Sequence, residues 1–151
     1  MSAEKRIQEL GLVLPDVPTP VASYVNSVRT GNLVHLSGGL PFNGEKRFVG
    51  KVPTDLSLEL AQEAARVVIL DRLSVLREEI GSLDKVVRIV SLQGFVNSDP
   101  DFYDHPKVIN GASELLLDIF GPKGRHTRIA LGAAALPLNA AVEISLVAEI
   151  E

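Results

Sequence analysis

The longest regular pattern in the chain is a stripe of apolar residues that recur at intervals of three and four between residues 57 and 80. Its members are Ala61, Ala65, Ile69, Leu73, Leu76 and Ile80. A period near that of the α-helix places them on one face, which predicts an amphipathic helix. Asp55 or Ser57 can cap its first turn, and Gly81 is a typical stop signal.

A second stripe of the same period predicts a second helix, which begins near Asp104 and ends at Gly121. Its members are Val108, Ala112, Leu115, Leu116 and Ile119. Asn110 lies roughly opposite this stripe, on a face that also carries Leu117. A leucine on the outer face indicates that this face is covered, and another subunit would cover it.

Alternation of apolar and polar residues predicts the strands of a sheet. The expected strands cover residues 21–28, 33–37 and 86–96, followed by two C-terminal strands between residues 128 and 150 that a short Pro/Asn turn joins. Ser37-Gly38-Gly39 follows the second strand. Two glycines there permit a close backbone approach to a ligand, or they simply form a bulge or a strand end.

The N-terminal segment differs from the rest. Residues 2–10 predict a short helix that Ser2 caps, and three prolines within residues 14–20 exclude a regular helix or a central strand. We therefore expect residues 1–20 to form a helix and a surface connector in front of a domain of residues 21–151. Residues 43–50 are polar and bounded by glycine, which predicts an exposed loop.

The predicted order is helix, β, β, α, β, α, β, β. Strands and helices do not alternate strictly, so a mostly antiparallel sheet with two helices on one face, an α+β fold, fits better than a doubly wound parallel sheet. The second face of that sheet would carry a mixture of small and polar residues: His35, Ser37, Gln93, Ala130 and Glu143. Oligomerisation through this face is the simplest way to cover it.

Composition narrows the function. The 151 residues are 46% hydrophobic and 23% charged, as in an ordinary soluble domain with its own core. A net charge of −4 weighs against nucleic acid or an anionic membrane as the partner. The chain has no cysteine, and its three histidines lack metal-site spacing, so no metal site is expected. With neither a signal-like apolar run nor a membrane-spanning segment, a cytoplasmic location is expected.

Two residues of the C-terminal segment carry the most informative chemistry. Arg128 shares a strand face with Ala130 and Gly132, so its charge has open space beside it. Either this guanidinium binds a small anion, such as a carboxylate, or it is a solvated arginine at the mouth of a strand. Glu143 could position a water molecule and move a proton.

Taken together, these residues resemble the Rid (YjgF) family of reactive-intermediate deaminases, formerly called endoribonuclease L-PSP. The matching positions are Tyr24-Val25, Gly31-Asn32-Leu33-Val34, Ser37-Gly38, Pro41, Val108-Ile109-Asn110, Arg128, Leu136-Pro137 and Val142-Glu143-Ile144. The resemblance implies a chorismate-mutase-like ββαβαββ fold, a homotrimer and three clefts between subunits. It also implies hydrolysis of short-lived enamines and imines, made from amino acids, to ammonia and a 2-keto acid, without a cofactor.

The resemblance implies roles for seven residues of this chain. The residue matching Arg128 binds the substrate carboxylate, and the residue matching Glu143 holds the attacking water. Five further residues are expected to contact the substrate: Tyr24, Ser37, Gly38, Asn110 and Ala130.

The chain also departs from the family pattern. Ile129, Ala130 and Leu131 stand where active deaminases have a hydroxyl residue, a cysteine and a valine, and Gly39 stands where they commonly have glutamine. The chain thus resembles a longer, divergent branch, and a non-catalytic trimer that binds a small carboxylate metabolite is the alternative. If the two C-terminal strands form a simple hairpin, Arg128 and Glu143 lie about 17 Å apart, which predicts a cleft shared between subunits.

Overall fold

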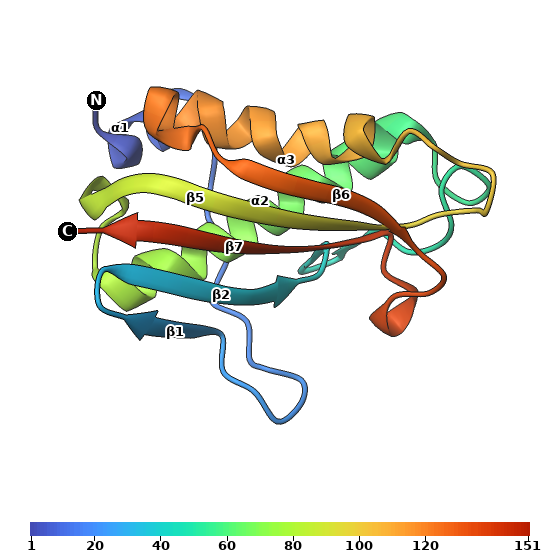
Figure 1. The fold of residues 1–151 in the computed structure, drawn as a ribbon, viewed down its shortest axis with the longest axis horizontal. Helices are drawn as coiled ribbons and strands as arrows, with labels where there is room; N and C mark the ends of the chain where they lie inside the picture. The colour runs from blue at the N-terminus through green and yellow to red at the C-terminus, as the bar shows by residue number, and fades with distance from the viewer.

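The computed structural model describes all residues from 1 to 151, and it forms a sheet with helices packed on one face (Figure 1). The strands of the five-stranded sheet are ordered β1-β2-β7-β5-β6. They comprise β1 (Ser27–Thr30), β2 (Leu33–Gly39), β5 (Val86–Asn97), β6 (Thr127–Ala133) and β7 (Val142–Ile150). All neighbours are antiparallel except β5 and β6, so the expected α+β class is confirmed.

The helices begin and end where the sequence pattern predicts. Helix α2 (Leu58–Ile80) starts at Ser57, whose side chain accepts a hydrogen bond from the Leu60 N–H, and ends at Gly81. Helix α3 (His105–Phe120) follows Asp104, which occupies the capping position without a side-chain bond. The two helices pack against each other on the same face of the sheet (Figure 1).

The N-terminal helix α1 (Ala3–Glu9) is capped by the Ser2 side chain, as expected. Its buried residues Ala3 and Ile7 join the same hydrophobic cluster as the two long helices and the sheet. Glu4 accepts hydrogen bonds from the Arg77 guanidinium and the Leu83 N–H, which fixes α1 to the end of α2. The division of the chain at residue 20 stays a prediction.

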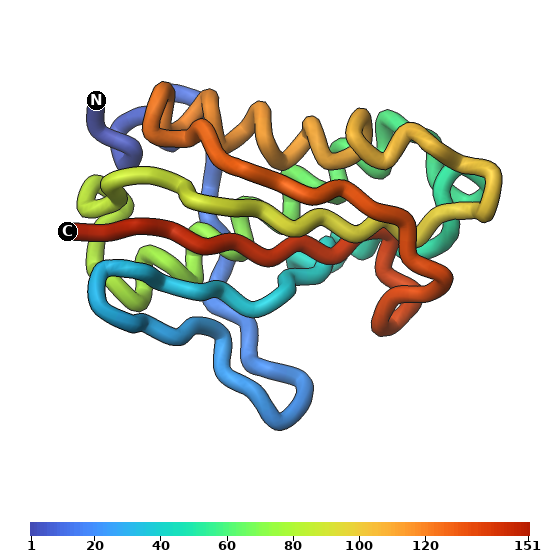
Figure 2. Tube along the Cα trace, in the orientation of Figure 1, coloured from blue at the N-terminus to red at the C-terminus, as the bar shows by residue number.

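The predicted C-terminal hairpin is wrong. Strands β6 and β7 are not paired, because β5 lies between them. The parallel pair β5 and β6 is joined by α3, and the chain then crosses past β5 through a short 3₁₀ turn, η3 (Pro137–Asn139), to reach the middle of the sheet (Figure 2). Alternation identifies a strand, but it does not say which strand is its neighbour.

Three smaller expectations are also corrected. Strand β1 begins only at Ser27, so Tyr24 lies in the connector. The ladder between β1 and β2 starts at the pair Ser27–Leu36, and beyond Leu36 the pairing of β2 with β7 contains a bulge. The expected 43–50 loop contains a two-stranded hairpin, β3 (Phe42–Asn43) with β4 (Lys46–Arg47).

The third correction concerns Ala130, which lies on the helix face of the sheet rather than on its open face. It is level with Gly94 of β5, and a side chain at Gly94 would contact Ile109 of α3. Ala130 accordingly packs against the hydrophobic core.

Candidate functional site

Arg128 lies on β6, at the edge of the sheet, and its side chain points toward α3. Register explains the direction, because Arg128 is level with Leu92, a core residue of β5 on the helix face. The Nη1 group donates hydrogen bonds to Asn110 Oδ1 at 2.8 Å and to Ser113 Oγ at 3.2 Å. Nη2 donates to the Pro106 carbonyl at 3.1 Å. The guanidinium is therefore fixed by three neutral acceptors, and no carboxylate neutralises it.

These bonds leave part of the Arg128 fork unused. A guanidinium has five N–H donors, and the chain itself uses two on Nη1 and one on Nη2. The Nε–H and one Nη2–H remain on neighbouring nitrogens, and such a pair matches the two oxygens of a carboxylate. Of the two readings of Arg128, the anion site has the better support from this geometry.

A second layer of hydrogen bonds supports Arg128. His126 Nδ1 lies 2.6 Å from the Gly124 carbonyl, so this nitrogen carries the proton in a neutral ring. His126 Nε2 then accepts from Ser113 Oγ at 2.9 Å, while Ser113 accepts from Arg128. A cavity of about 480 Å³ opens here, lined by Asn110, Ser113, Leu117, Arg125, His126 and Arg128.

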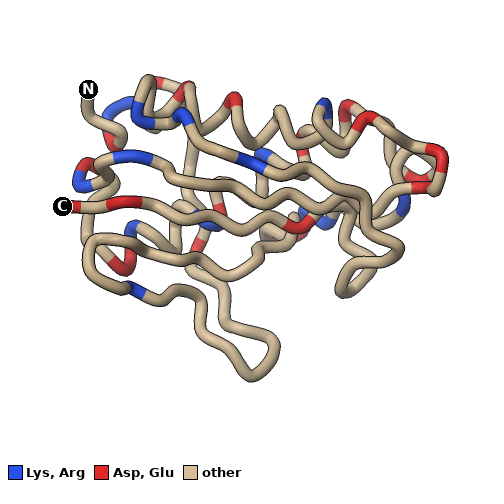
Figure 3. Tube along the Cα trace, in the orientation of Figure 1, with Lys and Arg blue, Asp and Glu red and all other residues tan.

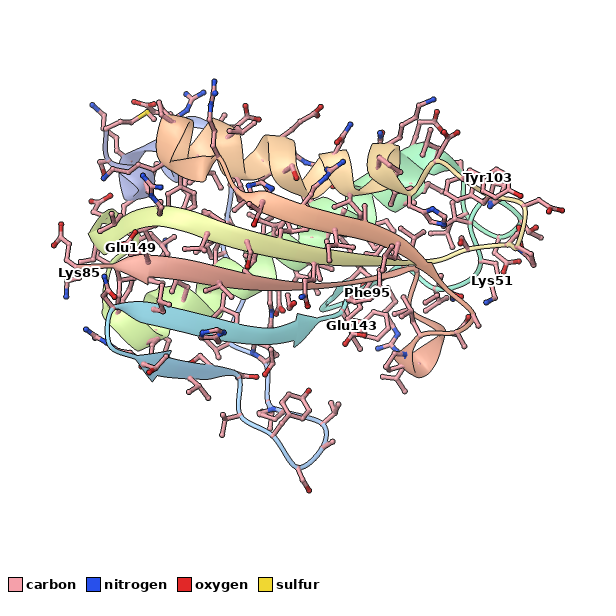
Figure 4. The ribbon with its side chains drawn as sticks, in the orientation of Figure 1. Lys51, Lys85, Phe95, Tyr103, Glu143 and Glu149 are labelled. Carbon is pink, nitrogen blue, oxygen red and sulfur yellow. The ribbon has the colours of Figure 1, made fainter.

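Glu143 lies elsewhere, on the open face of β7, where it pairs with Phe95 of β5 (Figure 4). It borders a cavity of about 450 Å³ whose other lining residues are Val21, Ala22, Tyr24, Ser37, Gly38, Leu40 and Pro137. Burial raises the pKa of the Glu143 carboxyl, and the nearby Arg72 guanidinium opposes that rise. Three predicted residues, Tyr24, Ser37 and Gly38, thus share one cavity with Glu143.

The backbone of Gly38 forms the wall nearest to Glu143. A Cβ atom at Gly38 would lie only 2.6 Å from Glu143 Oε1, so the carboxylate can keep this position only because Gly38 has no side chain. The Ser37 hydroxyl donates to the Val25 carbonyl at 2.6 Å, and the Ser37 N–H donates to the Asn26 carbonyl at 2.9 Å. Ser37 therefore holds the connector that carries Tyr24 against the sheet.

Sequence reasoning missed Asp71 and Arg72, which lie on α2 beneath this wall. Both side chains are almost fully buried, and Arg72 Nη2 contacts Asp71 Oδ2 at 2.7 Å. Burial raises the pKa of the Asp71 carboxyl, and Arg72 counteracts this. The available signal was two adjacent charged residues within the otherwise mostly apolar run of residues 67–76.

The predicted site residues therefore form two groups on opposite faces of the sheet. Arg128 is level with Leu92 and Leu146, whereas Glu143 is three residues further along β7 and faces the other way. Two strand spacings and three residues correspond to about 14 Å between the Cα atoms. The hairpin geometry behind the predicted separation is wrong, yet the two side chains are indeed apart within one chain.

The largest cavity, of about 600 Å³, contains none of the predicted residues. Its lining includes Lys51, Tyr103 and a Ser98–His105 pair whose Oγ and Nε2 atoms lie 2.9 Å apart. Figure 4 shows Lys51 and Tyr103 at one end of the sheet. The His105 ring has no hydrogen-bond partner besides Ser98, so this pair lacks the third group that would orient it as a base.

The distribution of charged residues and the lengths of the helices bear on which ligands and surroundings the protein could have. Basic and acidic residues are interspersed along the trace (Figure 3). No group of three or more His, Asp or Glu side chains is arranged to hold a metal ion. None of the helices is both long and apolar enough to cross a membrane.

A protein-family model, "YjgF/chorismate_mutase-like, putative endoribonuclease", matches residues 4–150. The chain belongs to the YjgF, or Rid, family. The match includes most of α1 and the Pro-rich connector as well as the sheet and the long helices.

Similar proteins come from distant organisms. Protein TCP17 of Trypanosoma cruzi is 41% identical over 146 residues, covering 95% of this chain and 91% of its own. The crystal structure of Atu1372 from Agrobacterium tumefaciens, of unknown function, has a TM-score of 0.91 at 40% identity, covering 99% and 92%. A protein from Shewanella oneidensis described as a putative endoribonuclease has a TM-score of 0.96 at 31% identity, covering 99% and 100%.

Proposed function

We propose that this protein is a cytoplasmic homotrimer that hydrolyses small imines or enamines derived from amino acids, releasing a 2-keto acid and ammonia. Each active site would combine the Arg128 group of one subunit with the Glu143 cavity of its neighbour. The observation that carries this proposal is the fixed, unneutralised Arg128 guanidinium, whose Nε–H and remaining Nη2–H stay free for a carboxylate.

The chemistry requires two tasks from the chain. The Arg128 fork binds the substrate carboxylate and so orients the adjacent C=N carbon. The Glu143 carboxylate accepts a proton from a water molecule, whose oxygen attacks that carbon, and the proton passes to nitrogen. The hydroxyl proton of the resulting carbinolamine also passes to nitrogen as the C–N bond breaks, so imine and water give one 2-keto acid and one ammonia, with no oxidant or reductant.

Two observations support a shared cleft. Arg128 and Glu143 lie on opposite faces within one chain, so one small substrate cannot contact both. Arg128 also belongs to β6, an edge strand whose open-face residues Ile129 and Leu131 are about half exposed, as expected of a surface that a neighbouring subunit covers.

The activity can be tested with an imine generated in solution. An amino-acid oxidase would produce the imino acid from an L-amino acid, and semicarbazide would trap it as an absorbing semicarbazone. The protein should lower the rate of trapping in proportion to its concentration, and Glu143→Gln should remove most of this effect. An unchanged trapping rate with several small amino acids would overturn the catalytic proposal.

The shared cleft has a separate test. Arg128→Ala and Glu143→Ala are expected to be inactive alone, and trimers reassembled from a mixture should recover activity, because some clefts receive both intact residues. Mass spectrometry of differently labelled subunits verifies exchange. Verified exchange with no recovery would refute a shared site.

A non-catalytic carboxylate binder is the second candidate, because Ala130 brings no reactive group beside Arg128. It predicts that pyruvate binds equally well to the wild type and to Glu143→Gln, with no imine hydrolysis by either. RNA cleavage is a weaker candidate function, although the Shewanella relative is called a putative endoribonuclease. The net charge of this chain is −4, whereas a protein that binds RNA usually carries a basic surface.

A further inference from the structure

The wall of the Glu143 cavity is a β-bulge that has to be held in place. Between Leu36 and Gly39, strand β2 advances three residues while β7 advances two, from Leu146 to Ile144. A bulge withdraws backbone groups from the ladder, and these groups need other partners. The Ser37 N–H donates a hydrogen bond to the Asn26 carbonyl.

The Ser37 carbonyl is satisfied by a buried arginine. Arg72 Nη1 donates to this oxygen at 2.7 Å, while Nε and Nη2 donate to Asp71 Oδ2 at 3.0 and 2.7 Å. The Arg72 side chain is 3% exposed. An arginine is rarely buried this deeply, and here it joins α2 to the bulge through a charge-assisted hydrogen bond.

Two consecutive glycines separate Arg72 from Glu143. A Cβ atom at Gly38 would lie 2.6 Å from Glu143 Oε1, and one at Gly39 would lie 2.5 Å from Arg72 Nε. The carboxylate and the guanidinium therefore approach the same short piece of backbone. Side chains at both positions would push the two charges away from it.

Arg72 is the charge that acts on Glu143. Arg72 and its partner Asp71 lie on the α2 side of the Gly38-Gly39 backbone, the connector contributes Tyr24 to the Glu143 cavity, and β5 contributes the uncharged Phe95 level with Glu143. Among these, Arg72 is the one that lowers the pKa of Glu143.

We infer that Arg72 is a positioning residue of the Glu143 cavity. Through the Ser37 carbonyl it fixes the Gly38-Gly39 bulge against Glu143, and across that bulge its positive charge favours the carboxylate that accepts the proton from water. The catalytic part of this inference rests on the proposed function, whereas the electrostatic part does not.

The test follows the titration of Glu143 directly. The protein is labelled with carboxyl-¹³C glutamate, and the Glu143 signal is assigned by its loss in Glu143→Gln. Asp71→Asn combined with Arg72→Gln removes both buried charges without leaving either unpaired. The midpoint of the Glu143 titration should then rise by about 0.5–1 pH unit.

Further variants separate charge from shape. Arg72→Lys keeps the charge, so the midpoint should stay near that of the wild type. Gly39→Ala keeps every charge but displaces the guanidinium from the bulge, and it should raise the midpoint even if the double variant fails to fold. Arg77→Gln, on the same helix but paired with Glu4, is the matched control and should leave the midpoint unchanged.

Activity provides the second readout. In the imine-trapping assay, the acidic limb of the pH profile should move with the midpoint measured by NMR. A raised midpoint in a protein without hydrolase activity would remove the proposed function and leave the electrostatic role of Arg72. If the protein is active but the titration midpoint of Glu143 is unchanged in both Asp71→Asn/Arg72→Gln and Gly39→Ala, the proposed role of Arg72 is wrong.

Discussion

Arg128 is held in position by neutral acceptors, and this distinguishes it from most arginines of the chain. Arg6, Arg66, Arg72, Arg77 and Arg88 each form an ion pair with a carboxylate. Asn110, Ser113 and the Pro106 carbonyl orient Arg128 without cancelling its charge. Asn110, expected to contact the substrate, thus contacts Arg128 in the folded chain.

The fork geometry leads to a prediction about Arg128→Lys. Lysine keeps the charge but offers a single ammonium in place of the planar fork. Losing a charged hydrogen bond costs about 1.5–3 kcal/mol, so pyruvate should bind about 10- to 100-fold more weakly. Isothermal titration calorimetry measures this, and Arg128→Ala should show no detectable binding.

Arg29→Ala provides the matched control for that titration. Arg29 is an exposed residue of β1, and its Nε donates only to the Gly31 carbonyl in the turn that follows. Its removal should leave pyruvate affinity unchanged. Wild-type affinity in Arg128→Ala, with an intact fold by circular dichroism, would show that the anion binds elsewhere.

At the level of elements, close packing between helices fixes where the Arg128 group lies. Gly111 of α3 sits directly against the backbone of α2, and a side chain there would overlap the Gln62 carbonyl oxygen. Gln62 also donates a hydrogen bond from its side chain to the Lys107 carbonyl of α3 at 2.9 Å. Because Asn110 precedes Gly111, this contact sets the height of Asn110 beside Arg128.

Gly111→Ala is therefore predicted to destabilise the fold although alanine is the better helix former. The gain in helix propensity is about 1 kcal/mol, whereas overpacking against a rigid backbone costs about 1–3 kcal/mol. Chemical denaturation should show a net loss of stability. Glu114→Ala, on the exposed side of α3, should change stability by less than about 0.5 kcal/mol. A stabilised Gly111→Ala would mean that α2 and α3 are not in contact at this position.

At the scale of the whole molecule, the sheet has one covered and one uncovered face. Helices α2 and α3 cover the first, while the second exposes Ile129 and Leu131 beside Phe95. An exposed apolar surface of this kind is typical of a protein–protein interface. It lies next to the Glu143 cavity, so assembly and the active site would be coupled.

We predict that the protein in solution has about three times the subunit mass of 16.2 kDa by light scattering. Leu131→Asp places a charge on the uncovered face and should shift the particle toward the subunit mass. Val13→Asp is the matched control, because Val13 is an apolar residue that is 80% exposed and belongs to the connector, not to a strand of the sheet. A wild-type monomer at micromolar concentration would contradict the trimer.

The sequence by itself determined the two long helices and the segments that form the main sheet. The apolar stripes of α2 and α3 have a helical period over many residues, and Ser57, Gly81 and Gly121 mark their ends, so local chemistry was sufficient. The alternating strands likewise predicted the α+β class, and the C-terminal residues around Arg128 and Glu143 led to the family. These features depend on residues close together in the chain.

Only the tertiary structure decided which strands are adjacent in the sheet and which distant residues are in contact. Alternation could not show that β5 lies between β6 and β7, and this placement sends Arg128 toward α3 and Glu143 to the opposite face. Arg72 was missed for the same reason. Its partners are the adjacent Asp71 and the Ser37 carbonyl, 35 residues away in the sequence, and only the folded chain brings that carbonyl within 2.7 Å. The periodicity of a sequence indicates the face of an element on which a side chain lies. A site also depends on residues of other elements that contact this side chain, and these contacts form only in the folded chain.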